Sequence, residues 1–191
     1  MIIGITGGTG CGKSTALNVI RDLGGLVLDC DAIYHELLKT DNALLTAIEA
    51  RFPGTVTEGR LDRKALGATV FSDPNALADL NAITHGAVCR EVTRRLETAP
   101  SLAAIDAIAL FESGLAELCH LTVAVTAPLE DRVKRLMARD QIPEDYARAR
   151  IQAQPPEEYF RSRCDHILEN TETAEAFREK CLAFFAEQGI M

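Results

Sequence analysis

The chain has 191 residues, 47% hydrophobic and 25% charged, so it can bury the core of one ordinary domain. Twenty Lys and Arg against 28 Asp and Glu give a net charge of -8, which argues against general binding to nucleic acid or anionic membranes. No apolar run approaches the roughly 18 residues of a membrane-spanning helix, and the N-terminus lacks a secretory pattern. We therefore expect a cytoplasmic protein with reduced cysteines that binds neither nucleic acid nor membrane.

The chain begins with the pattern of a strand, a loop and a helix. Residues 2–6 form a β-branched run that ends in glycines, and residues 13–23 show helical spacing of their apolar side chains. Residues 26–28 then predict a second buried strand, followed by Asp29 and Asp31. This alternation is typical of α/β proteins.

Residues 32–100 contain no comparable buried strand, and their pattern is helical. The clearest helix has Asp73 as a plausible cap and Pro74 at its first position, and its apolar stripe continues to Leu96. We interpret this region as a helical insertion into the α/β core.

The core pattern resumes after the insertion. Residues 102–110 and 121–125 predict two further strands of a parallel sheet that is buried on both faces. Pro128 opens a helix with an apolar face, and Pro143 opens a polar helix that we expect to be exposed. A short strand at 166–168 and an aromatic-rich helix complete the chain. Strands separated by helices predict an open parallel sheet with ligands at the carboxyl ends of its strands.

The segment from Gly7 to Ser14 matches the phosphate-loop pattern G-x-x-x-x-G-K-[ST], and it lies between a predicted strand and a predicted helix, as the mechanism requires. Glycines allow backbone N–H groups to curl around a phosphate, and the helix N-terminus adds partial positive charge. We expect Gly7, Gly10 and Gly12 to tolerate no replacement. The motif predicts binding of a nucleoside triphosphate.

Individual roles follow from the chemistry of such loops. Lys13 can reach the β- and γ-phosphates of ATP, the Ser14 hydroxyl can bind the bridging Mg²⁺, and Thr15 can assist at the α-phosphate. The predicted nucleotide-binding residues in the loop are Gly7, Gly8, Thr9, Gly10, Cys11, Gly12, Lys13, Ser14 and Thr15.

The class of enzyme is narrowed by what the sequence lacks. There is no Asn-Lys-x-Asp segment of the kind that GTPases use to read guanine, and a motor or helicase would need more chain and a basic surface. These absences favour a compact kinase. A kinase for another nucleoside or small metabolite, and a protein that binds ATP without transferring phosphate, remain alternatives.

A small-molecule kinase needs a carboxylate that takes the proton from the acceptor hydroxyl. Asp29 and Asp31 follow the second predicted strand, and their alternation lets only one of them face the site. The alternative for Asp31 is capping of the next helix.

Arginines gather after the strand at 121–125, as Arg132, Arg135, Arg139, Arg148 and Arg150. A solvated helix face is one interpretation. In a kinase they would form a mobile lid that brings guanidinium groups to the phosphates and excludes water, with Arg139 as the favoured member.

Two acidic residues flank the strand predicted at 102–110. Either Asp106 or Glu112 could hold a water bound to Mg²⁺, and Glu112, beyond the carboxyl end, is the better placed of the two. His85 in the insertion is a weaker functional candidate, because a lone histidine is more often structural.

Taken together, these segments resemble the dephospho-coenzyme A kinases over nearly the whole chain. Beyond the phosphate loop, the resemblance is carried by the segments Asp29-Cys30-Asp31, Leu61-Asp62-Arg63, Leu80-Asn81-Ala82-Ile83-Thr84-His85, Leu110-Phe111-Glu112-Ser113-Gly114-Leu115, Arg135-Leu136-Met137-Ala138-Arg139-Asp140 and Arg150-Ile151-Gln152-Ala153-Gln154, with Asp165 and Asn170. Gly86 and Ile108 stand where that family usually has proline.

The resemblance implies ATP-dependent phosphorylation of the ribose 3′-hydroxyl of dephospho-coenzyme A, the last step of coenzyme A synthesis. It implies a three-layer phosphate-loop kinase fold with a nucleotide-binding core at 1–31, 101–138 and 164–191, a helical substrate domain at 32–100 and a small helical lid at 139–163. The protein would act as a monomer or weak homo-oligomer.

The same resemblance assigns roles to residues. Asp31 is the base, Lys13 and Arg139 act on the transferred phosphoryl group, and Asn170 lies near the adenine. With Asp31, the residues assigned to the acceptor substrate are Arg63, His85 and Glu112.

Overall fold

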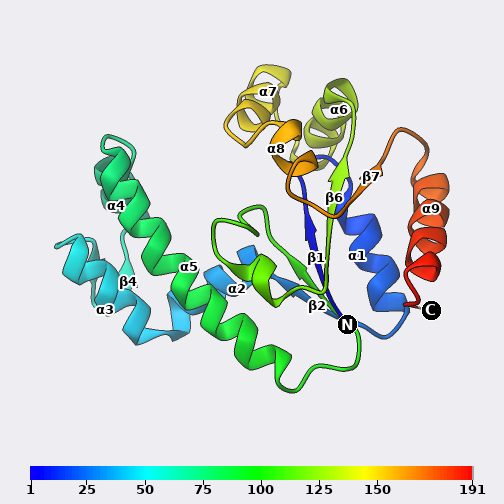
Figure 1. Cartoon of the computed structure of the whole chain (residues 1–191). Coiled ribbons are helices and arrows are strands. Elements are labelled where there is room, and N and C mark those ends of the chain that lie inside the picture. The colour runs from blue at the N-terminus through cyan, green and yellow to red at the C-terminus, as the bar shows by residue number, and fades with distance from the viewer. Residues whose placement is uncertain (191) are drawn as a thin grey trace. The chain divides into compact units, whose positions relative to one another are not determined.

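The structure is a computed structural model that describes residues 1–190 (Figure 1). It divides into two compact units, which we call the sheet unit and the helical unit. The sheet unit consists of Met1–Leu28 and the chain from Ala99 onward, and the helical unit is Asp29–Thr98. No helix within the described residues is long and apolar enough to cross a lipid bilayer.

Five strands form one sheet in the order β2-β5-β1-β6-β7. Their bounds are Ile2–Thr6 for β1, Leu26–Asp29 for β2, Ala103–Asp106 for β5, Leu121–Thr126 for β6 and His166–Glu169 for β7. The central strand β1 pairs in parallel with both neighbours, so that Ile3 lies beside Ala104 on one side and Leu121 on the other. The predicted α/β fold with a parallel sheet is confirmed.

Alternation along β1 shows how both faces of the sheet are covered. Ile3 and Ile5 are fully buried in a core shared with helices α1, Lys13–Asp22, and α9, Ala174–Glu187. These two helices lie side by side (Figure 1). Gly4 points to the opposite face, where a Cβ would stand 2.7 Å from a Leu110 methyl carbon. Because successive strand residues face opposite sides, both faces of β1 are removed from water.

The strand predicted at 102–110 is too long, because β5 ends at Asp106. Residues 107–110 leave the sheet and lead through turns to the 3-10 helix η1, Leu115–Leu118. Leu110 is fully buried although it lies outside the strand. The apolar run therefore reflects burial under the sheet, and hydrophobic periodicity cannot separate that from a strand.

The helix that begins after Pro143 is also less exposed than its composition predicts. In α7, Glu144–Gln152, Ala147 and Ile151 are buried against Val133 and Leu136 of α6, Leu129–Asp140. The short helix α8, Glu157–Arg161, follows. The expectation of a wholly exposed polar helix is wrong, since one face of α7 forms a small core with α6.

The helical unit is built around one long helix. Its helices are α2, Cys30–Thr40, α3, Asn42–Arg51, α4, Arg63–Val70, and α5, Pro74–Leu96, and a small hairpin joins β3, Val56–Thr57, to β4, Arg60–Leu61. The predicted start of α5 is confirmed: the Asp73 carboxylate accepts a hydrogen bond from the Asn75 N–H at 2.9 Å, and Pro74 occupies the first position. Gly86 lies within this uninterrupted helix.

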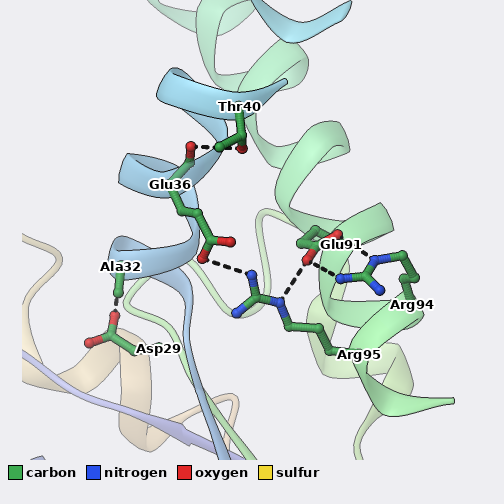
Figure 2. A network of polar contacts seen from close by, with 7 residues as sticks. All are labelled: Asp29, Ala32, Glu36, Thr40, Glu91, Arg94 and Arg95. Atoms are coloured by element: carbon green, nitrogen blue, oxygen red, sulfur yellow. Dashed lines mark hydrogen bonds and ion pairs between the residues drawn. The ribbon is translucent and has the colours of Figure 1, made fainter. Parts of the chain in front are cut away.

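An ion-pair network joins α2 to α5 (Figure 2). Arg95 of α5 contacts Glu36 of α2 at 2.8 Å and Glu91 of its own helix at 2.7 Å, and Arg94 also contacts Glu91. The two arginines hold the pKa of the Glu91 carboxyl at about 2. This network holds α2 against the last turns of the long helix.

Candidate active site

The phosphate loop occupies residues 7–12, between the end of β1 and the start of α1. Gly7 and Gly12 have φ values of 130° and 96°, in the region that side chains disfavour. A Cβ on Gly7 would stand 2.2 Å from the Val125 carbonyl oxygen, and one on Gly12 would stand 2.2 Å from Asn170 Nδ2. Both conformation and close packing therefore require glycine at these positions.

Three side chains bind the loop from outside by its carbonyl groups. Arg132 Nε donates to the Thr9 oxygen at 2.9 Å, Arg135 Nη1 donates to the Gly10 oxygen at 3.2 Å, and Asn170 Nδ2 donates to the Cys11 oxygen at 2.9 Å. In a trans peptide the N–H points away from the preceding carbonyl. The N–H groups of Gly10 and Gly12 are thereby turned away from these side chains, as an anion-binding loop requires.

The loop borders a hollow of about 590 Å³. Its charged lining consists of Lys13, Arg135 and Arg139 with one acid, Asp106. Lys13 Nζ donates to the Gly7 oxygen at 2.8 Å, which folds the ammonium group back over the loop. A protein with an overall charge of -8 thus gathers three cations around its phosphate loop, and the chemistry of this lining suits a polyphosphate.

The oxygen ligands at the hollow fit Mg²⁺ bound together with a nucleotide. Ser14 and Asp106 both line it, and within residues 1–190 no three His, Cys, Asp or Glu side chains form a metal cluster. Mg²⁺ in such enzymes takes one or two protein ligands and completes its shell with phosphates and waters. The two oxygens present match that requirement.

Asp106 and Glu112 are placed differently from the expectation. Asp106 lies at the carboxyl end of β5 and borders the hollow, because the strand ends there. Glu112 is in the following turn, and its carboxylate accepts a hydrogen bond from the Tyr159 hydroxyl at 2.6 Å. Burial and this carboxylate raise the pKa of Tyr159 to about 12, so the phenol keeps its proton. The argument that Glu112 is better placed than Asp106 for the metal is therefore wrong.

The three arginines of α6 differ in what they touch. Arg132 is buried, and its Nη2 has no hydrogen-bond partner among the described residues. Arg135 reaches the loop carbonyls and Asn170, while Arg139 lines the hollow and makes two hydrogen bonds to Asp140. Pairing with Asp140 raises the pKa of Arg139. Choosing Arg139 alone from the sequence overlooked Arg132 and Arg135, although their three-residue spacing was the signal.

Asn170 supports the loop from the end of β7. Its Nδ2 binds the Cys11 carbonyl, its Oδ1 accepts from Arg135 Nη2 at 3.3 Å, and its backbone N–H donates to Thr126 at 2.8 Å. Asn170 is only 5% exposed. These contacts give its side chain a structural task at the loop, and its expected proximity to adenine stays a prediction.

Asp29 and Asp31 belong to the start of α2 in the helical unit. Asp29 is the N-cap, and its carboxylate accepts from the Ala32 N–H at 2.9 Å. Asp31 is exposed in the first helical turn. Capping, the alternative considered for Asp31, is therefore the task of Asp29. Because the helix begins at Cys30, alternation along a strand was the wrong reason for separating the two.

The other residues predicted to bind substrate also lie in the helical unit. Arg63 opens α4, and its Nη2 lies 3.3 Å from His35 Nδ1. His85 is half-buried within α5. The structure brings Arg63 to a hollow lined by further cations but gives His85 no place there.

One residue of the site was not predicted. Gln154 Oε1 accepts a hydrogen bond from the Thr9 N–H at 2.7 Å. The segment from Arg150 to Gln154 was part of the resemblance, but local periodicity gives no indication of a contact made so far along the chain.

Comparison with known proteins agrees with this geometry. Residues 1–175 match the protein family described as dephospho-CoA kinase. A dephospho-CoA kinase of Thermus thermophilus is 43% identical over 190 residues, which cover 98% of this chain and 91% of the relative. A crystal structure of a Thermus thermophilus protein matches with a TM-score of 0.80 and 40% identity over 98% of this chain and 97% of that one. A Campylobacter jejuni dephospho-CoA kinase matches with a TM-score of 0.68 and 27% identity, covering 100% and 98% of the two chains.

Proposed function

The chain belongs to the dephospho-CoA kinase family, the phosphotransferases of the last step of coenzyme A synthesis, and from that premise we propose which residues carry out the transfer. The γ-phosphoryl group of ATP passes to the ribose 3′-hydroxyl of dephospho-CoA, giving coenzyme A and ADP. The observation that carries this proposal is the phosphate loop, which Arg132, Arg135 and Asn170 hold by its carbonyl groups.

Charge around the transferred group comes from three cations. Lys13 leaves its hydrogen bond with Gly7 to contact the β- and γ-phosphates, and Arg135 and Arg139 line the same hollow. Donors aimed at the equatorial oxygens stabilise the charge that develops there during transfer. In this kind of reaction most of the catalysis is positioning and electrostatics.

Asp31 is the proposed base. Its exposed carboxylate accepts the proton of the 3′-hydroxyl as the new O–P bond forms and the bond to ADP breaks. The exposure of Asp31 supports this role, as does the capping contact of Asp29, which leaves Asp31 without that task.

Ser14 and Asp106 are the residues that would hold Mg²⁺, directly or through water. When bound, the ion supplies neutralising charge between the β- and γ-phosphates. Ser14 is exposed at the mouth of the hollow, so its hydroxyl can reach a ligand there without rearrangement of the helix.

The remaining assignments concern larger parts of the chain. We assign acceptor binding to the helical unit and lid function to residues 139–163. Support for the second assignment comes from the side chains of that segment that reach the rest of the sheet unit, Gln154 at Thr9 and Tyr159 at Glu112. Six free cysteines support a reducing location such as the cytoplasm.

The test is release of ADP from Mg·ATP with different acceptors. Dephospho-CoA should stimulate release strongly, whereas adenosine and adenosine monophosphate should stimulate it weakly or not at all. Stimulation by another acceptor alone would replace the substrate assignment. Tight ATP binding without stimulation by any acceptor would replace the kinase with a nucleotide-binding protein.

A further inference from the structure

The helical unit contains a hollow whose lining is strongly basic. It measures about 460 Å³ and is bordered by Lys39, Arg60 and Arg63, with Glu58 as its single acid. None of the three cations makes an ion pair within residues 1–190, whereas Arg51, Arg94 and Arg95 of the same unit are all paired. We call this the cationic hollow.

Three unpaired cations around one hollow repel one another, and an anion placed among them relieves that repulsion. The arrangement is the more notable because acids outnumber bases in the chain, 28 to 20. Arg63 also lies 3.3 Å from the His35 ring, which orients its guanidinium group without neutralising it. The chemistry of the cationic hollow therefore fits a phosphate or diphosphate group.

A second hollow, of about 470 Å³, adjoins one face of α3. We call it the α3 groove. Its lining residues are Asn42, Leu45, Thr46, Glu49, Ala50, Val56 and Gly59. The five that belong to α3 recur at helical spacing, so they form one stripe along the helix. Apolar side chains dominate this stripe together with short polar groups that can bond an amide.

The two hollows share Gly59, in the turn between β3 and β4. Glu58 and Gly59 both have left-handed φ values, 51° and 72°, and a Cβ on Gly59 would meet no atom within 4 Å. The space over Gly59 is therefore open, and an extended ligand can pass from one hollow to the other across the turn.

Glu49 fixes the hairpin that separates them. Its two carboxylate oxygens accept hydrogen bonds from the Gly54 and Val56 N–H groups, each at 2.7 Å. These bonds lower the pKa of Glu49 and engage the one acidic group of the α3 groove. The groove thus presents no unengaged carboxylate to a neutral ligand.

We propose that the diphosphate of dephospho-CoA binds in the cationic hollow and that its pantetheine arm crosses Gly59 into the α3 groove. The proposal rests on the proposed function, because it takes the acceptor from there. Dephospho-CoA carries a doubly charged diphosphate next to an uncharged, amide-containing arm. That order of charge and neutrality matches the order of the two hollows.

The test uses two variants with matched controls, each checked for a wild-type unfolding transition. Arg60→Gln removes one exposed cation of the hollow, and Lys64→Gln removes an exposed cation of the same unit outside it. Ala50→Phe fills the α3 groove, and Ala47→Phe adds the same bulk to an exposed position of α3 outside the groove.

Arg60→Gln should raise the KM for dephospho-CoA about tenfold, the effect of losing one charge-assisted hydrogen bond. Ala50→Phe should raise it by a similar factor, and both should leave the KM for ATP and kcat unchanged. The controls should match wild type. A KM within twofold of wild type for both test variants, or an equal change in the controls, would overturn the proposal.

Direct binding separates failure of this inference from failure of the proposed function. Calorimetric titration of dephospho-CoA without ATP should give weaker binding to Arg60→Gln and Ala50→Phe than to their controls. A wild-type protein that binds dephospho-CoA but transfers no phosphate to it would refute the function and still test the two hollows. An active wild type with unchanged binding in both variants would refute only the inference.

Discussion

The Gln154 side chain accepts a hydrogen bond from the backbone N–H of Thr9 at 2.7 Å, although the two residues are 145 positions apart in the chain. Gln154 lies just beyond α7, and Thr9 lies in the phosphate loop. The contact therefore ties the segment assigned as a lid to the loop that binds the triphosphate. Arg132 approaches the same place from α6, donating to the Thr9 carbonyl.

Replacing Gln154 with Ala should weaken the loop without removing any charge. The loss of one side-chain hydrogen bond to the backbone should lower the free energy of unfolding by about 1 kcal/mol. The KM for ATP should change several-fold, while the KM for dephospho-CoA stays constant. Gln152→Ala, at an exposed position of the same helix, is the matched control. Identical ATP kinetics in the two variants would show that the Thr9 contact has no role in nucleotide binding.

Asp31→Asn and Asp29→Asn should differ in turnover, although the residues are two positions apart. Asp31→Asn removes the proposed base and should lower kcat at least about a hundredfold, with ATP binding retained. Asp29→Asn keeps an N-cap side chain that can accept from Ala32, so its stability and kcat should stay close to wild type. The check is steady-state kinetics together with a nucleotide-binding titration. Undiminished turnover in Asp31→Asn would remove it from the base position.

Gly12→Ala and Gly24→Ala should separate backbone strain from packing. Both glycines have positive φ, 96° and 80°, so both variants incur a conformational penalty of about 1 kcal/mol. Only at Gly12 would the new Cβ meet an atom, Asn170 Nδ2, whereas at Gly24 it meets nothing within 4 Å. Gly12→Ala should therefore be the more destabilised in urea unfolding and should lose ATP binding. Equal destabilisation would mean that Asn170 yields without cost.

Glu91 should make the stability of the helical unit depend on pH in acid. Its pKa of about 2 lies below the ordinary value of 4.5, so the ionised group stabilises the folded state fully above about pH 5. That contribution decreases as pH falls from about 5 toward 2. The difference in unfolding free energy between wild type and Glu91→Gln should accordingly shrink between pH 6 and pH 3. Glu117→Gln, at an exposed position outside any described ion pair, should show no such trend.

Local patterns predicted those parts of the fold that local forces decide. The cap at Asp73, the proline at position 74 and the phosphate-loop glycines each act within a few residues, and the structure confirms them. The apolar run after Asp106 was misassigned because a buried turn and a buried strand have the same composition.

The site was predictable to the same extent. Lys13 and Ser14 follow from the loop motif, whereas the supports at Gln154 and Asn170 are contacts across the sheet unit that no periodicity encodes. Asp106 was misjudged for the metal only because the end of its strand was misplaced. Errors in the site thus followed from errors in element boundaries, which sequence patterns define least well.

The most direct test of the account is the position of the phosphate in the product made from Mg·ATP and dephospho-CoA. Mass spectrometry should show the addition of one phosphoryl group, and phosphorus and proton NMR should place it on the ribose 3′-oxygen. Asp31→Asn should form the same product at a much lower rate. A phosphate at the 2′-oxygen or on the pantetheine arm, or no phosphorylated product while ATP is bound, would contradict it.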